Sequence, residues 1–242
     1  MKQGIYTIER NRQLTGDFFE MILLGDTSSL TAPGQFINIR LDGFFLRRPI
    51  SVCDWKAGEI TMIYKIAGQG TEAMSHMAPG QQLDVLCGLG NGFDVTKCGQ
   101  RTLVIGGGIG AAPMYALAKA LLRAGKTPVA ILGFNKKEDI FCEEKFRALG
   151  IETRVTTADG SYGIPGFVTA ALPEKYDYYC ACGPTPMLRA VYDAAPTSGL
   201  LSFEERMGCG FGACMGCSCQ TKYGNKRICR DGPVLEKEEI IW

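Results

Sequence analysis

Short apolar runs of the β-strand type, separated by turn residues, fill the first part of the chain. They are Ile5–Ile8, Phe18–Leu24, Phe36–Leu41, Ile60–Ile66 and Leu83–Leu86. In the third run apolar residues alternate with Asn38 and Arg40, and Pro-Gly pairs stand at residues 33–34 and 79–80. Several short strands at this spacing predict a small antiparallel β-barrel, which we expect to occupy residues 1–98.

From residue 99 to residue 200, apolar strands alternate with helical segments. The expected strands are Thr102–Ile105, Val129–Leu132, Ile151–Thr156 and Tyr178–Ala181. The expected helices are Pro113–Ala124, Glu143–Leu149, Phe167–Leu172 and Thr185–Ala194. This order predicts an α/β unit, a parallel sheet with helices on both faces. Residues 201–242 have too little apolar periodicity for a core of their own, and we expect a metal to order this third unit.

Charge balance and histidine content argue against several classes of function. The 242 residues include 26 Lys and Arg and 25 Asp and Glu, so the net charge is +1. Nucleic-acid binding would require a basic field that this chain lacks. The single histidine, His76, argues against a multi-histidine metal site and most triad chemistry. Residues 1–14 lack the apolar centre of a secretory signal, and the longest uncharged stretch, Thr102–Ala118, is short for a membrane span. We expect a soluble, cytoplasmic protein.

Cysteines are the most informative residues: the chain has 11, five of them between residues 209 and 229. Cys209, Cys214, Cys217 and Cys229 follow the spacing C-x4-C-x2-C-x11-C, whose first part matches plant-type [2Fe-2S] proteins. Intervening glycines allow main-chain N–H groups to approach the sulfurs. A four-cysteine zinc site is the alternative, although zinc ribbons more often carry two C-x2-C pairs. Spacing alone does not exclude Cys219 as a ligand.

A glycine-rich turn follows the first strand of the α/β unit and opens a helix. Gly106, Gly107, Gly108 and Gly110 fit the pattern G-x-G-x-x-G/A, in which the backbone approaches a pyrophosphate. The acidic ribose ligand expected about 20 residues further on is missing, so an ordinary dehydrogenase site is not indicated. A glycine-rich packing turn is the alternative interpretation.

A second candidate site lies at the end of the last strand of this unit. Cys182, Gly183 and Pro184 fall at the carboxyl end of the sheet, where open α/β sheets bind ligands. Cys182 is a candidate nicotinamide contact, and a plain strand-end cysteine is the alternative. After the third strand, residues 156–160 carry an acid and no base, which favours NAD over NADP.

Four motifs in order carry a resemblance to a known superfamily. They are Arg48-Pro49-Ile50-Ser51, Gly70-Thr71, GGGIGAAPM at 106–114 and CGPTPM at 182–187. Together they resemble the ferredoxin–NAD(P)⁺ reductases, a flavin-binding barrel joined to a nicotinamide-binding sheet. The tail, FEERMGCGFGACMGCSC at 203–219 with RICRDGPV at 227–234, is more specific. It resembles the family of electron transfer subunits of dihydroorotate dehydrogenase B, the NAD⁺-linked type.

The resemblance implies roles for individual residues of the barrel. Arg48 suits the FAD pyrophosphate, because its planar fork pairs with phosphate oxygens, and a solvated basic pair with Arg47 is the alternative. Ser51 is implied to donate to the flavin N5 and, with Cys182, to be catalytic. Tyr64 is implied to contact flavin, with packing inside the barrel as the alternative. The remaining implied cofactor-binding residues of the barrel are Pro49, Ile50, Ile63, Lys65, Gly70 and Thr71.

The implied function is electron transfer without a substrate site in this chain. A flavin exchanges one or two electrons, so FAD is expected between the [2Fe-2S] cluster and NAD⁺. The implied partner is an FMN-containing catalytic subunit that oxidises dihydroorotate in pyrimidine (UMP) biosynthesis, in a heterotetramer with two copies of each chain. The alternatives are a diaphorase subunit of a hydrogenase, sulfide dehydrogenase or NADPH–ferredoxin transhydrogenase, and a zinc or redox-sensing module.

The cluster loop is also expected to be the surface that meets the partner. Phe211 and Met215 are predicted to project from it, because glycines around them leave little bulk. Four basic residues are predicted to form a rim around the fourth ligand: Lys222, Lys226, Arg227 and Arg230.

Overall fold

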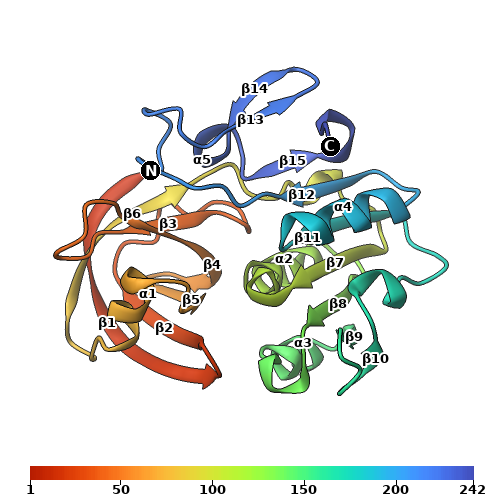
Figure 1. The fold of residues 1–242 in the computed structure, drawn as a ribbon, viewed down its shortest axis with the longest axis horizontal. Coiled ribbons are helices and arrows are strands. Elements are labelled where there is room, and N and C mark those ends of the chain that lie inside the picture. The colour runs from red at the N-terminus through yellow and green to blue at the C-terminus, as the bar shows by residue number, and fades with distance from the viewer.

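The computed structural model describes residues 1–242, which begin with a closed antiparallel β-barrel (Figure 1). Its strands follow the order β1-β2-β5-β4-β3-β6. They are β1 (Lys2–Thr15), β2 (Phe18–Leu24), β3 (Phe36–Ile39), β4 (Arg48–Lys56), β5 (Glu59–Lys65) and β6 (Gln82–Leu89). Apolar side chains from all of these strands fill the barrel, which confirms the fold predicted for this part of the chain.

Two elements of this unit were absent from the prediction. Strand β4 has no regular alternation, because only Val52 and Cys53 of its nine residues are buried. Helix α1 (Gln69–Ser75) stands where the sequence predicts only a turn, because glycines dominate its start. In β3, Asn38 does not face solvent as the alternation suggests and is 1% exposed. Another part of the chain must therefore cover it.

The second unit is built on a seven-stranded sheet of order β10-β9-β8-β7-β11-β12-β15. Its strands are β7 (Thr102–Gly107), β8 (Val129–Phe134), β9 (Glu152–Thr157), β10 (Ile164–Pro165), β11 (Tyr178–Cys182), β12 (Gly199–Ser202) and β15 (Val234–Glu236). All neighbours are parallel except β12 and β15. The first strand of the unit, the predicted Thr102–Ile105, extends further, to Gly107.

Helices cover both faces of this sheet, as the βαβα pattern predicts. Helices α2 (Ala111–Arg123) and α3 (Glu143–Ala148) pack on one face. Helix α4 (Thr185–Ala194) and the short 3-10 helix Val168–Ala171 pack on the other. None of the helices combines the length and the apolar character needed to cross a bilayer.

The cysteine-rich tail shares the sheet of the second unit. It forms β13 (Ser218–Thr221), β14 (Gly224–Arg227), α5 (Ile228–Asp231) and β15. β15 pairs antiparallel with β12, from Ser202↔Val234 to Leu200↔Glu236. Buried tail residues join the core on the α4 face of the sheet, namely Cys217, Ile228, Cys229, Leu235 and Ile240.

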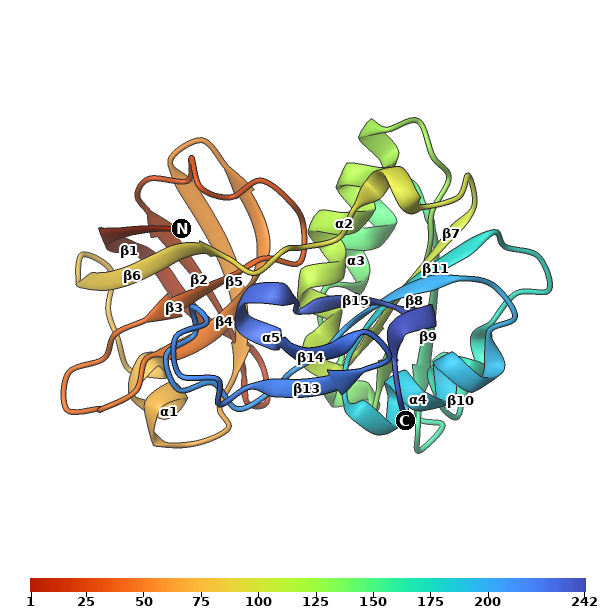
Figure 2. The ribbon, with the colours of Figure 1, turned by 90° about the horizontal axis from the view of Figure 1, so that it is seen from above.

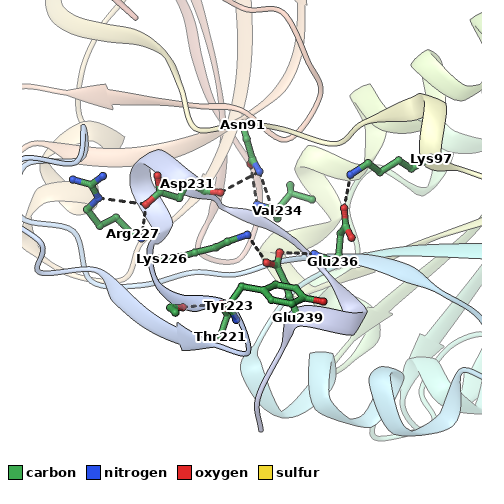
Figure 3. A network of polar contacts seen from close by, with 11 residues as sticks. Asn91, Lys97, Thr221, Tyr223, Lys226, Arg227, Asp231, Val234, Glu236 and Glu239 are labelled. Carbon is green, nitrogen blue, oxygen red and sulfur yellow. Dashed lines mark hydrogen bonds and ion pairs between the residues drawn. The ribbon is translucent and has the colours of Figure 1, made fainter.

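A polar network ties the tail to the segment that links barrel and sheet (Figure 3). Asn91 of that segment accepts from the Val234 N–H at 3.1 Å and donates to the Val234 carbonyl at 2.7 Å. Lys97 pairs with Glu236, and Lys226 of β14 pairs with Glu239. The three parts of the chain are thus joined close to the cysteine cluster.

Candidate cofactor sites

The four cysteines of the predicted cluster lie in two contacting pairs. The N–H of Cys209 donates to Cys214 Sγ and that of Cys214 to Cys209 Sγ, both at 3.4 Å. The Cys229 N–H donates to Cys217 Sγ, also at 3.4 Å. No three His, Cys, Asp or Glu side chains are grouped as ligands of one metal ion. Two thiolates for each of two irons fit a [2Fe-2S] cluster better than a tetrahedral zinc site, which needs all four around one ion.

The loop around the first pair is shaped to hold thiolates. Burial acts to raise the pKa of Cys209, but the N–H groups of Cys214, Phe211 and Ala213 outweigh it and lower that pKa to about 6. A Cβ on Gly208 would lie 3.2 Å from Cys214 Sγ, so a larger residue would crowd the sulfur. These residues therefore fit an iron–sulfur cluster.

Cys219, the fifth candidate, is placed differently. It lies on strand β13, paired with Lys226, and its side chain packs against the core on the α4 face. Burial raises the pKa of its thiol, as it also does for the predicted ligand Cys229, so its place on β13 and not its pKa separates Cys219 from the two pairs.

Asn38 joins the cluster loop to the barrel. Its Nδ2 donates to the Cys209 carbonyl at 3.2 Å, and a Cβ on Gly210 would approach that Nδ2 to 2.3 Å. In the barrel, Asn38 pairs with Pro49 of the Arg48-Pro49-Ile50-Ser51 motif. The cluster loop thus rests on the strand next to the one that carries the predicted flavin contacts.

Arg48 and Gly70, predicted to hold the flavin pyrophosphate, lie together. The Arg48 guanidinium donates to the Leu46 carbonyl at 2.5 Å and lies 4.8 Å from the ring centroid of Phe44. A Cβ on Gly70 would come within 2.0 Å of Arg48 Nε, so only glycine leaves the guanidinium its place. The Thr71 hydroxyl accepts from the Ala67 N–H at 2.9 Å and fixes the turn before α1. This cradle fits an anionic group bound through Arg48.

The other predicted flavin residues occupy mixed positions. Ser51 and Ile50 are half-buried on β4. Ile63 is buried on β5, and Lys65 lies over the Phe18 ring at 5.4 Å.

Tyr64 lies in the barrel core. Its side chain is buried there, and its hydroxyl donates to Asn11 Oδ1 at 2.9 Å. Burial raises the pKa of the phenol to about 12. These contacts agree with the alternative of packing inside the barrel, and a flavin contact of Tyr64 stays a prediction.

A cleft of ≈ 550 Å³ opens at the carboxyl ends of strands β7, β8, β9 and β11. The sheet contributes residues of the glycine-rich turn and of the last strand's end. The barrel contributes Phe18 and Lys65. The cleft is also lined by Gly107, Gly108, Asp139, Phe167, Gly183, Pro184, Met187 and Glu204. Open α/β sheets bind nucleotides at this edge.

The glycines of the turn divide into two kinds. A Cβ on Gly106 would lie 2.5 Å from Ala111 Cα, one on Gly107 2.2 Å from Met187 Sδ, and one on Gly110 2.3 Å from the Cys182 carbonyl. Glycine at these three positions permits close packing of the turn. They therefore agree with the alternative interpretation of the motif, a glycine-rich packing turn. Gly108 has open space around it, φ of +53°, and faces the cleft. It is the position at which a phosphate can approach the backbone.

Cys182 lies beneath the cleft. Its thiol is 1% exposed, and burial raises its pKa to about 12, so the sulfur is protonated at neutral pH. Gly183 and Pro184 line the cleft, as predicted residues of this strand end should. In this arrangement the Cys182 sulfur does not reach the cleft surface, and its contact with a nicotinamide stays a prediction.

Two acidic residues of the cleft escaped the sequence analysis. Asp139 follows β8 by five residues, too far beyond the strand end for the usual ribose-ligand spacing, yet the chain folds it back into the cleft. Glu204 comes just after β12, and its exposed side chain lines the cleft. Its place directly after a strand end was the available signal.

We expect a preference for NAD over NADP, since Asp139 would repel a 2′-phosphate and no arginine lines the cleft. Repulsion of about 1–4 kcal/mol at short range corresponds to a preference for NAD of roughly fivefold or more. Steady-state kcat/KM values for the two nucleotides check this. Asp139→Asn should reduce the preference for NAD over NADP. Glu138→Gln should leave it unchanged, because Glu138 lies outside the cleft. A wild-type chain that favours NADP would contradict the prediction.

Comparison with known proteins agrees with this arrangement. Residues 204–241 match the family described as the iron-sulfur cluster binding domain of dihydroorotate dehydrogenase B, and residues 104–193 match the oxidoreductase NAD-binding domain. The chain is 44% identical to the dihydroorotate dehydrogenase B (NAD(+)) electron transfer subunit of Bacillus pumilus, over 99% of this chain and 98% of that one. The same subunit of Fusobacterium nucleatum is 42% identical, over 99% of each chain.

This chain belongs to that family. The resemblance predicted from the motifs is confirmed, and the domains and fold that the comparisons identify support the three predicted cofactors: FAD, a [2Fe-2S] cluster and NAD. A solved structure of NADH-dependent reduced ferredoxin–NADP oxidoreductase, reported for flavin-based electron bifurcation, is also similar. It superimposes with a TM-score of 0.90 at 31% identity, covering 99% of this chain and 90% of that one.

Proposed function

We propose that this chain accepts electrons from the catalytic subunit of an NAD⁺-linked dihydroorotate dehydrogenase at its cluster loop and delivers them to NAD⁺ in the cleft. A bound flavin supplies the exchange between single electrons and hydride. The observation that carries the proposal is the order of the three sites. Asn38 connects the cluster loop to the flavin strands, and Lys65 of the same barrel borders the nucleotide cleft.

The chain's residues serve this relay by positioning. Arg48 and Gly70 form the cradle for the flavin diphosphate, with Ser51 three residues along the same strand. Gly108 leaves the cleft open for the nucleotide diphosphate. His76, the one histidine, closes helix α1 and does not line the cleft. With no acid–base constellation for a second substrate, the oxidation of dihydroorotate to orotate is assigned to a partner chain.

The partner in this proposal is an FMN-containing catalytic subunit, in a cytoplasmic complex with two copies of each chain that serves pyrimidine synthesis. The cluster loop supports such docking. Cys214 is exposed, and Phe211 and Met215 are 45% and 55% exposed beside it. A partner can therefore approach the cluster closely.

The basic rim expected around Cys229 is wrong in one respect. Lys226 pairs with Glu239 and Arg227 with Asp231 (Figure 3). Lys222 donates to the Glu238 carbonyl at 2.8 Å. These cations stabilise the tail internally. Lys222 and Arg230 form no ion pair with an acidic side chain, and both residues are exposed.

The deciding experiment uses the chain copurified with the dihydroorotate dehydrogenase catalytic subunit of its own organism. Dihydroorotate added without oxygen should bleach the flavin and cluster absorbance, and NADH should form when NAD⁺ is added. A chain that assembles with this subunit but stays oxidised would contradict the proposal.

The likeness to the ferredoxin–NADP oxidoreductase favours one second candidate, a subunit of a ferredoxin-linked transhydrogenase. Reduced ferredoxin replaces dihydroorotate as the electron donor in that reading. Reduction of the chain's complex by ferredoxin and not by dihydroorotate would decide for it.

A further inference from the structure

The barrel carries an apolar loop whose exposed side chains have no part in the proposed relay, although Arg48 of the flavin cradle donates to its Leu46 carbonyl. Between β3 and β4, Phe45 is fully exposed at 101% and Leu46 is 42% exposed. Ile5 on β1 is 60% exposed as well. Single exposed apolar residues are ordinary, but a contiguous group marks an interaction site.

Strand register places this group beside the cluster loop. Ile5 pairs with Asp84 of β6, and the Arg40 N–H donates to the Asp84 carbonyl at 2.9 Å, so the three residues form one row across the barrel wall. Asn38, which holds the Cys209 carbonyl, precedes Arg40 by two residues and shares its face of the strand. The two positions are about 7 Å apart.

Arg47 fixes the loop to that row. Its guanidinium donates to the Asp84 carbonyl at 2.9 Å and to Asp84 Oδ2 at 3.0 Å. Phe45 and Leu46 are therefore carried on an anchored loop. In Figures 1 and 2 this orange loop and the blue loop before β13 both lie on the barrel side of the molecule.

The cluster loop itself shows a side chain held outward. Met215 has φ of +62°, a conformation that favours glycine, and two contacts from Ser218 to its carbonyl maintain it. In this conformation the thioether remains 55% exposed next to Cys214.

The small area of the cluster loop, and the polarity of the surfaces on either side of it, indicate in which direction a partner's contact must extend beyond the loop. A stable interface buries about 800 Å² on each partner, more than the glycine-rich loop 208–217 can supply. On one side of that loop is the hairpin β13–β14, where Gln220, Lys222 and Asn225 are exposed and Tyr223 is the one exposed aromatic residue. On the other side is the apolar barrel loop.

We propose that Ile5, Phe45 and Leu46 form one docking surface with Phe211 and Met215, and that the dihydroorotate dehydrogenase catalytic subunit covers it. This inference rests on the proposed function, since the partner must reach the cluster. It adds that the flavin barrel, and not the cluster segment alone, fixes the partner's orientation. The matching surface of the partner is accordingly apolar.

The test compares Phe45→Glu with Tyr223→Glu in the holoprotein. Tyr223 is 77% exposed at the tip of the β13–β14 hairpin, which points away from the barrel, and is the matched control. Binding to the immobilised catalytic subunit should weaken at least about tenfold for Phe45→Glu and stay unchanged for Tyr223→Glu. FAD and iron content, and NADH oxidation by ferricyanide, should match the wild type in both variants.

Three results would overturn the assignment. Unchanged binding by Phe45→Glu places the docking surface elsewhere, and loss of FAD assigns Phe45 to the flavin site. Self-association of the isolated chain that Phe45→Glu abolishes gives this surface to a second copy. If the wild-type chain itself fails to bind the catalytic subunit, the proposed function fails first, which separates the two cases.

Discussion

A Cys214→Ser variant is expected to purify with FAD but without its [2Fe-2S] cluster. Two irons need four thiolates, and Cys214 shares hydrogen bonds with its pair member Cys209. Iron and acid-labile sulfide should fall from about two of each per chain to near zero. Electron flow from dihydroorotate to NAD⁺ should fall to background, while NADH oxidation by ferricyanide continues through the flavin.

Cys219→Ser is the control for this result. Its thiol lies two residues beyond Cys217 but packs against the core, so the cluster content should not change. Full iron and sulfide in the Cys214 variant, or their loss in the Cys219 variant, would show that the ligand set is different.

Arg48→Ala is expected to lose most of its FAD during dialysis. A charge-assisted contact to phosphate contributes about 1.5–3 kcal/mol, which corresponds to roughly a 10- to 150-fold weaker affinity. Gly70→Ala should act in the same direction, because its Cβ would meet the Arg48 guanidinium at 2.0 Å. Flavin fluorescence released into the dialysate measures both.

Arg40→Ala removes the same charge from the barrel outside this cradle. The Arg40 side chain is 66% exposed and lies 4.0 Å from Asp84, so its loss should leave FAD bound. If Arg48→Ala keeps full flavin occupancy, the diphosphate is bound elsewhere on the barrel.

Periodic segments were predictable from the sequence because their burial is regular. Phe18–Leu24 forms a strand with the predicted bounds, and the helix at Thr185–Ala194 is also as predicted. β4 was missed because only Val52 and Cys53 of its residues are buried, so its sequence shows no alternation of apolar and polar residues. β15 was missed because three residues give no period, and only its pairing with β12 defines it.

The candidate sites were predictable where chemistry depends on spacing along the chain. The cluster cysteines belong to this class, whereas the Arg48 cradle was implied by the family resemblance. Residues brought in by folding were not: Asp139 and Glu204 reach the cleft from loops, and Asn38 is covered by a segment about 170 residues away. The alternation in β3 even predicted the wrong surroundings for Asn38, because the pattern of one strand does not report what packs on it.

Because β15 lies near the end of the chain, it is synthesised well after β12, the strand with which it pairs. Strand β12 is complete at Ser202, but its free edge has no partner until Val234–Glu236 has been made. All four cluster ligands lie between these two strands. The nascent chain therefore exposes an open sheet edge, the kind that invites association with other chains, for as long as the cysteine segment is being translated. The four cluster cysteines and the strand that closes this edge are therefore synthesised in that order, on one stretch of about 30 residues.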